Sequence, residues 1–159
     1  VVECAATGVP AGLGAPFFEG VEAVMAAQLF SIPAVKGVEF GAGFHAAAMR
    51  GSEYNDPYAL SQGRVTTVRN SAGGLLGGIS NGMPIVVRAA FRPTPSISLE
   101  QQTVSLSQQT PQALAVRGRH DPCVAVRAVP VVEGAVALAL LELWLERRAS
   151  LPLTPREDL

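Results

Sequence analysis

The segment 130–149 is apolar on almost every side of the helix that it predicts, and this restricts the folds open to the chain. A helix with apolar residues on all sides must be covered by protein over most of its surface. We therefore expect a long, centrally buried helix whose large apolar side chains are Val131, Val132, Val136, Leu138, Leu140, Leu141, Leu143, Trp144 and Leu145.

A membrane span is the other explanation for such a helix. The longest uninterrupted apolar run, 135–141, lies between Glu133 and Glu142. A span needs roughly 20 predominantly apolar residues, so we expect no membrane partner and infer that the apolar surplus is buried against protein.

The charge content agrees with extensive burial and excludes one class of partner. Charged residues make up 16% of the chain, against roughly 25% in an average soluble domain. A free monomer would need more polar cover than this. Because 12 Lys and Arg face 13 Asp and Glu, no basic stripe is available to neutralise phosphates, and we expect no nucleic-acid partner.

The length and the two cysteines restrict the number of domains and the cellular compartment. A chain of 159 residues predicts one domain or a piece of a larger one. Cys4 and Cys123 are too few for a disulfide framework, and no leading segment resembles a signal peptide, so we expect a cytoplasmic protein. The opening residues 1–5 read as the middle of a strand, and we expect the chain to be incomplete at its N-terminus.

Hydrophobic spacing predicts the elements of the first part. A helix is expected over 17–32, with one buried stripe at helical spacing, and Glu19 and Glu22 lie away from that stripe near the helix start. A strand is expected over 35–40, followed by a short helix over 45–49. The members of the helical stripe are Phe18, Val21, Met25, Leu29 and Ile32.

The second part alternates polar and apolar segments. Residues 51–70 have no hydrophobic period and predict a mobile surface loop. The nearly unbroken apolar run 83–91 predicts a strand covered on both faces, and the prolines of 92–96 must leave the sheet. A polar stretch over 98–111 leads to a strand over 113–116. One domain is expected over 1–149, with a flexible tail over 150–159.

Two glycine pairs lie within the segment 70–82. Such glycines let backbone N–H groups approach a bound anion or ring. They also suit a tight backbone crossing, and that alternative stays open. The spacing matches neither the G-x-G-x-x-G fingerprint nor the phosphate-binding P-loop.

Arginines favour an anionic ligand. Arg88 and Arg92 lie on one segment, and Arg117, Arg119 and Arg127 lie on another. The guanidinium fork binds carboxylate and phosphate through two hydrogen bonds, so a small polyanion is the natural counterpart. Surface ion pairs are the alternative for any one of them.

The segment 118–123 brings a cation, an imidazole, a carboxylate and a thiol together. Asp121 is a candidate acid or base with Arg119 close by, and a structural cap before Pro122 is the alternative. His45, His120, Cys4 and Cys123 lack the spacing of metal ligands, so no metal site is expected. His120 and Cys123 are also poorly arranged for a Cys-His nucleophile.

The motifs together resemble the chorismate synthase family, specifically the C-terminal half of its chain. The resemblance runs in order over about 1–148. It is carried by 8–14, 31–39, 49–52, 72–74, 77–82, 92–97, 118–123 and 127–133.

This resemblance implies a lyase of the shikimate pathway, on the route to aromatic amino acids. Such an enzyme converts 5-enolpyruvylshikimate 3-phosphate to chorismate by 1,4-elimination of phosphate, and it uses reduced FMN. It also implies an α+β fold in which antiparallel sheets enclose a helical core, assembled as a homotetramer.

Carried over by position, the resemblance assigns roles to named residues. Asp121 is the catalytic residue that assists proton handling, and Arg119 also holds the anionic substrate. The residues expected to contact the flavin are Pro33, Ala34, Gly77, Arg92, Pro93, Thr94, Pro95, Ser96 and Arg119.

The sequence departs from the family at a few places. Arg92 stands where the family commonly has Lys. Gly134 and 141–144 also differ, within the expected buried helix. The family's first half, with two catalytic histidines, has no counterpart here, and neither His45 nor His120 matches them. The isolated chain is therefore expected to be inactive, and a non-catalytic flavin-binding or oligomer-scaffold module remains the alternative.

Overall fold

The computed structural model describes residues 1–150, and strand β7 (Ile85–Phe91) is the centre of its main sheet. The sheet has the order β1-β7-β2, in which β1 (Val2–Ala6) and β2 (Val35–Phe40) both pair with β7 antiparallel. The expected strands over 1–5, 35–40 and 83–91 are thus confirmed to within two residues. On β7 the buried positions alternate, with Ile85, Val87 and Ala89 on one face. The expectation that both faces are covered is not met within residues 1–150, where helices pack on one face and the alternate positions of β7 are only partly buried.

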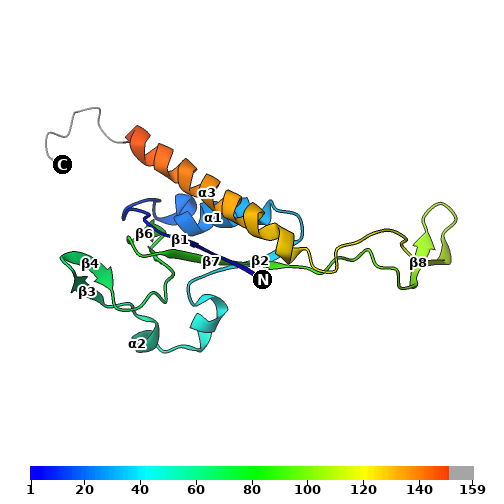
Figure 1. Ribbon diagram of the computed structural model, residues 1–159, viewed down its shortest axis with the longest axis horizontal. Helices are drawn as coiled ribbons and strands as arrows, with labels where there is room; N and C mark the ends of the chain where they lie inside the picture. The colour runs from blue at the N-terminus through cyan, green and yellow to red at the C-terminus, as the bar shows by residue number, and fades with distance from the viewer. Residues whose placement is uncertain (151–159) are drawn as a thin grey trace.

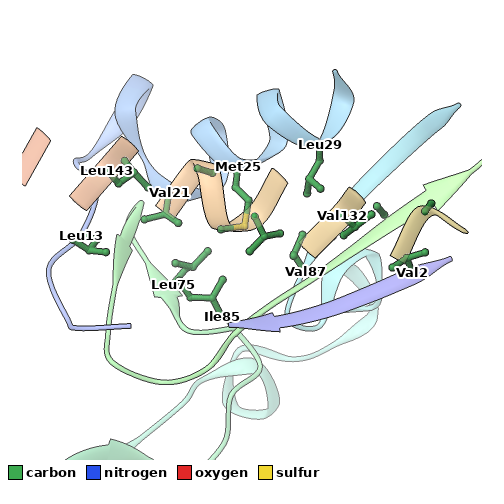
Figure 2. Packing of buried hydrophobic residues seen from close by; sticks show 14 residues of the cluster. Val2, Leu13, Val21, Met25, Leu29, Leu75, Ile85, Val87, Val132 and Leu143 are labelled. Atoms are coloured by element: carbon green, nitrogen blue, oxygen red, sulfur yellow. The ribbon is translucent and has the colours of Figure 1, made fainter. Parts of the chain in front are cut away.

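Two helices cover this face of the sheet (Figure 1). Helix α1 (Val21–Phe30) packs on β2 and on α3 (Ala125–Ser150), which in turn packs on β1. Figure 2 shows the side chains of both helices meeting those of the sheet in one cluster. The largest fully buried members are Leu13, Val21, Met25, Leu29, Ile85, Val87, Val132 and Leu143. The chain is therefore α+β, with its core between a helix pair and an antiparallel sheet.

The first helix is shorter than expected. A 3-10 turn η1 (Phe17–Glu19) precedes it, and Gly20 between them has extended backbone angles. A side chain at Gly20 would lie 3.1 Å from the Cα of Gly78, and the N–H of Val21 donates to the carbonyl oxygen of Gly78 at 2.9 Å. This backbone contact starts the helix at residue 21. Phe18, expected in the buried stripe, is consequently 94% exposed, whereas the prediction for Val21, Met25 and Leu29 is confirmed.

Helix α3 begins five residues earlier than expected and is buried along one stripe only. The stripe consists of Ala128, Val132, Val136, Ala139 and Leu143. The expectation of burial on all sides was wrong for the part of the chain that the structure describes. Large apolar side chains on the remaining surface are exposed, namely Val126, Val129, Val131, Leu138, Leu141, Trp144 and Leu145.

The same helix is long and apolar enough to cross a membrane, by length and composition alone. The length of the uninterrupted run 135–141 understated this, because a window of 18 helix residues keeps a high mean hydropathy even though one or two charged residues interrupt it. Its buried stripe packs on α1 and β1. Packing of this kind is also typical of a core helix in a protein without membrane spans.

Two segments expected to be loops contain hairpins. Residues 51–70 hold a short helix α2 (Gly51–Tyr54) and the hairpin of β3 (Tyr58–Ser61) with β4 (Arg64–Thr67). Residues 98–116 hold the hairpin of β8 (Gln101–Ser105) with β9 (Thr110–Leu114), which replaces the expected strand over 113–116. Both were missed because their strands are largely polar and exposed, so no hydrophobic alternation marks them.

The remaining elements are small. The expected helix over 45–49 is a 3-10 helix η2 (Gly43–Ala48), and the glycine-rich segment folds into the hairpin of β5 (Leu75–Leu76) with β6 (Ile79–Ser80). Ser150, placed in the tail by the sequence, is the last residue of α3. The rest of the expected tail, 151–159, lies outside the described residues.

Candidate functional site

The segment 92–124 between β7 and α3 forms a long arm that ends in the β8–β9 hairpin (Figure 1). Its outgoing leg is 92–100 and its returning leg is 115–124. The hydroxyl of Thr94 on the first leg donates to the backbone carbonyl oxygen of Asp121 on the second, at 2.9 Å. This bond joins two of the segments that the sequence predicted to share a site.

A third predicted segment meets the base of the arm. Pro33 and Ala34 form the turn between α1 and β2, and the carbonyl oxygen of Ala34 accepts the N–H of Arg92 at 2.8 Å. Ala34 has a φ of +75°, which is uncommon for a residue other than glycine and costs free energy. The structure thus gathers Pro33, Ala34, the segment 92–96 and Asp121 at one end of the sheet.

A shallow hollow of about 270 Å³ lies between the two legs. Residues with hydroxyl side chains line it from the outgoing leg, and Gly118, His120 and Asp121 line it from the returning leg. Ligand sites usually have volumes of roughly 300 to 1,000 Å³, so this hollow is slightly smaller than a typical ligand site. Its lining residues are Thr94, Ser96, Ile97, Ser98, Gly118, His120, Asp121 and Pro122.

The carboxylate of Asp121 has a cationic partner that the sequence did not assign to it. The Nε of Arg127, in the first turns of α3, lies 3.0 Å from Oδ2 of Asp121. The two side chains are 72% and 45% exposed, so the pair orients Asp121 more than it stabilises the fold. Arg119, which we expected beside this carboxylate, makes no ion pair within residues 1–150.

Two of the predicted arginines remain available to an anion. The side chain of Arg92 is exposed and, among residues 1–150, hydrogen-bonds only to the carbonyl oxygen of Pro93, at 3.5 Å. Arg119 is exposed, and its side chain makes no hydrogen bond with residues 1–150. Arg92 begins the outgoing leg, and Arg119 lies on the returning leg two residues before Asp121.

Arg88 has a structural role and does not contribute to this set. Its Nε lies 2.9 Å from Oε1 of Glu39, and an Nη donates to the carbonyl oxygen of Gly41 at 2.6 Å. Glu3 lies 4.0 Å from it on the other neighbouring strand. Arg88 therefore ties the three strands together, which is the ion-pair alternative of the sequence analysis.

Gly77 lies away from the other predicted flavin contacts. It is exposed in the β5–β6 turn, and its neighbour Gly78 packs against Gly20 at the start of α1. Pro33 and Ala34 follow the end of the same helix. Because α1 has 10 residues and a helix rises about 1.5 Å per residue, some 15 Å separates the two groups.

The glycine pairs serve mainly as a tight backbone crossing. A Cβ on Gly74 would lie 2.6 Å from the carbonyl oxygen of Pro84, so no side chain fits there. Nearby, Asp56 is buried and its carboxylate accepts the N–H groups of Ser71 at 2.9 Å and Ala72 at 2.8 Å. Burial raises the pKa of Asp56, but these hydrogen bonds and Arg69 outweigh burial and hold the pKa below its ordinary value.

Cys4 lines a second hollow, of about 400 Å³, between β1 and α3. Burial, followed by the nearby carboxylate of Glu133, raises the pKa of the Cys4 thiol. The thiol is therefore less reactive than a free cysteine. No group of three or more His, Cys, Asp or Glu side chains gathers as a metal site within residues 1–150.

Sequence reasoning missed three parts of the site region. These are the bond from Thr94 to Asp121, the ion pair of Arg127 with Asp121, and the anchoring of Ser71 and Ala72 by Asp56. All three join residues that are distant in sequence or lie across a turn. The only local sequence signal was the Asn-Asp-Pro motif at 55–57, which predicts a turn but not that the carboxylate of Asp56 is buried.

The amino-acid sequence is similar to those of known proteins. The family model described as chorismate synthase matches residues 1–145. The chorismate synthase of Thermococcus kodakarensis is 54% identical over 149 residues, which are 94% of this chain and 42% of that protein. The chorismate synthase of Archaeoglobus fulgidus is 57% identical over 145 residues, which are 91% of this chain and 40% of that protein.

The fold is also similar to that of a solved structure. The protein described as "Crystal Structure of Chorismate Synthase" superposes with a TM-score of 0.69 at 36% identity, over 91% of this chain and 37% of that chain. The chain thus spans about 40% of the length of the curated relatives that it matches.

Proposed function

Because the chain belongs to the chorismate synthase family, we propose that it supplies one wall of a lyase active site of the shikimate pathway. The reaction is the elimination of phosphate from 5-enolpyruvylshikimate 3-phosphate, with reduced FMN, to give chorismate. The observation that carries this proposal is the gathering of Ala34, the segment 92–96 and Asp121 through the two hydrogen bonds at the base of the arm.

The groups at the base of the arm fit part of a flavin nucleotide. Arg92 and Arg119 offer guanidinium groups to a phosphate, while Thr94 and Ser96 offer hydroxyls beside the apolar edge of Ile97. The residues that would hold the flavin are Pro33, Ala34, Arg92, Pro93, Thr94, Pro95, Ser96 and Arg119, and Gly77 would need to reach it from a separate position. Reduced FMN, when bound, supplies electron density that assists the departure of phosphate.

The chain's own polar residues then have distinct roles. Arg119 binds the anionic groups of the substrate, because its exposed guanidinium makes no hydrogen bond or ion pair within residues 1–150 and can accept an anion. Asp121 is the catalytic residue and holds or moves a proton at Oδ1. Its other oxygen, Oδ2, is oriented by Arg127 at 3.0 Å.

A larger assembly would complete the site. We propose that the chain corresponds to the C-terminal portion of its relatives and that their remaining portion closes the hollow. The same portion would cover the exposed apolar surface of α3, where Leu138 and Trp144 are 59% and 42% exposed. We further propose a cytoplasmic homotetramer, in which other subunits cover what remains.

Flavin binding by the chain tests the pocket. We expect FMN fluorescence to be quenched on titration with the chain, and Arg119→Ala to weaken this binding because a phosphate contact is lost. Arg64→Ala, which removes an exposed arginine on β4, is the matched control and should bind as the parent does. Binding that ignores Arg119→Ala would instead favour the non-catalytic scaffold module.

Turnover tests the division of roles. The chain alone, with reduced FMN and substrate, should form no chorismate. Addition of the remaining portion of a relative such as the Thermococcus kodakarensis protein, expressed separately, should restore formation. Measurable turnover by the isolated chain would contradict the proposed division.

A further inference from the structure

The side chain of His120 belongs to the hollow between the legs but has no role in the site described above. It lines the hollow from the returning leg, and Ser96 lines it from the outgoing leg. Within residues 1–150 neither nitrogen of the His120 imidazole makes a hydrogen bond or an ion pair. A neutral imidazole has one N–H donor and one acceptor nitrogen, so a ligand in the hollow can use this ring.

Gly118 allows the imidazole to fold back onto the returning leg. A Cβ at position 118 would lie 3.1 Å from Nε2 of His120 and 3.3 Å from its Cε1. Carbon atoms in ordinary contact are roughly 3.5 to 4.0 Å apart, so any side chain at position 118 would push the ring away. Because Gly118 and His120 both line the hollow, the missing side chain leaves room for the ring at its edge.

The charges and the size of the hollow favour a small anionic group. Besides His120, the segment 92–127 carries four arginines and two carboxylates. Of the carboxylates, Asp121 already has Arg127 at 3.0 Å, and Glu100 does not line the hollow. An anion is therefore the favoured ligand for an N–H donor there. The volume of about 270 Å³ suits one phosphate group better than a whole flavin nucleotide.

We propose that His120 is a further ligand-binding residue, which donates a hydrogen bond to a phosphate monoester in the hollow, and that Gly118 is the positioning residue for its ring. This assignment rests on the proposed function, because that function brings two phosphate monoesters to the site. One belongs to reduced FMN and the other to 5-enolpyruvylshikimate 3-phosphate. His120 contacts the phosphate from the returning leg, and the hydroxyl of Ser96 faces it from the outgoing leg.

The imidazole signals in an NMR spectrum test the contact directly. The chain has two histidines, and the other one, His45, lies in η2 and does not line the hollow. His45→Gln assigns the two Cε1–H resonances. At constant pH and ionic strength, the chain is titrated separately with inorganic phosphate, FMN, riboflavin and 5-enolpyruvylshikimate 3-phosphate.

Each titration has a defined expected result. The His120 resonance should move with inorganic phosphate and should stay in place with riboflavin, which lacks the phosphate of FMN. FMN and 5-enolpyruvylshikimate 3-phosphate, added singly, distinguish the two sources, because only a phosphate that reaches the hollow moves the resonance. The His45 resonance should stay in place throughout.

Substitutions measure how much the ring and its position contribute. His120→Ala should weaken binding of the phosphate ester that moves the resonance by about tenfold. His120→Gln, whose amide also donates an N–H, should recover most of this loss, and His45→Ala is the matched control without effect. Gly118→Ala should move the His120 resonance in the free chain and weaken the same binding. Gly134→Ala, where a Cβ meets nothing within 4 Å, should do neither.

The outcomes separate this contact from the proposed flavin site. A His120 resonance that none of the phosphate compounds moves, or that riboflavin moves as far as FMN does, would overturn the phosphate contact. In either case, quenching of FMN that is sensitive to Arg119→Ala leaves the flavin site in place. Conversely, a His120 resonance that moves with inorganic phosphate, in a chain that does not quench FMN, supports the phosphate contact and contradicts the flavin site.

Discussion

The β3–β4 and β8–β9 hairpins are both two-stranded and both extend from the same core, but they are attached to it differently. The first is held by Asp56, whose buried carboxylate binds the N–H groups of Ser71 and Ala72. Arg69 adds hydrogen bonds to the carbonyl oxygens of Ser52 and Asn55, at 3.1 and 2.7 Å. Among the residues that the structure describes, the legs of the second are joined by one side-chain hydrogen bond, from Thr94 to the carbonyl oxygen of Asp121.

The difference indicates that the chain's own contacts order the β3–β4 hairpin, whereas the β8–β9 hairpin depends on a contact from outside the described residues. Charge-assisted hydrogen bonds to a buried carboxylate are worth more than neutral ones, so the chain itself fixes β3–β4. The β8–β9 arm carries the candidate site on its legs and an open strand edge at its end. Its order would then come from what binds to it, which suits a segment that helps to form a site.

The largest expected effect is that of Asp56→Asn. The amide presents an N–H group to one of two backbone N–H donors, so a buried donor loses its acceptor, at a cost of about 1 to 3 kcal/mol. Urea unfolding at neutral pH should show this loss, and the amides of Ser71 and Ala72 should exchange faster. Asp121→Asn is the matched control on the arm, and an equal loss of stability there would break the comparison.

The effect of Asp56 should depend on pH in a defined direction. Its folded-state pKa lies below its ordinary value, so the carboxylate stabilises the fold fully above the unfolded pKa of roughly 3.9. This contribution is lost as the pH falls through the lower, folded-state pKa. The difference in unfolding free energy between parent and Asp56→Asn should therefore be constant near neutral pH and shrink in acid. A gap that widens in acid would contradict the assignment.

The next largest effect on stability is expected from substitutions in the turns of the two hairpins. Gln62 and Gly63 have φ of 51° and 76°, the positive values of a two-residue type I′ turn. A Cβ at Gly63 would meet nothing within 4 Å, so Gly63→Ala should cost only the conformational penalty, about 1 kcal/mol. On the arm, Gln109 has a φ of 53°, and Gln109→Gly should not destabilise its hairpin. Amide exchange of the strand ends measures both, and a loss of protection in both variants would contradict the expectation.

The smallest effect on stability is expected at the base of the arm. Thr94→Val keeps the side-chain shape and removes the hydrogen bond to Asp121, which weakens the contact between the two legs by about 0.5 to 1.5 kcal/mol without changing the global free energy of unfolding. This change should act locally, because the legs contribute little to the core. We expect an unchanged unfolding midpoint with weaker FMN binding, measured by fluorescence titration, whereas Thr103→Val on β8 should leave both unchanged. A lowered midpoint would show that the arm is more strongly coupled to the core than the structure indicates.

The sequence predicted the elements that pack in the core better than the two hairpins that protrude from it. The spacing of Val21, Met25 and Leu29 and the apolar run ending at Phe91 report burial directly, and both elements were confirmed. The hairpins were missed because strands such as Gln101–Ser105 bury no face and leave no hydrophobic period. The motifs at 33–34, 92–96 and 118–123 predicted the candidate site, but not that Thr94 and Arg127 hold Asp121.

Local pattern by itself determined the helix pair, the central strand, the exit of the chain at Pro93 and the membership of the family. These follow from side-chain period, proline chemistry and ordered motifs, all of which are local. Long-range contacts, in contrast, bury α3 along one stripe, join three strands through Arg88 and separate Gly77 from Ala34. Such facts depend on which distant segments meet, and the free energy of a long-range contact is set by its partner as much as by the residue itself.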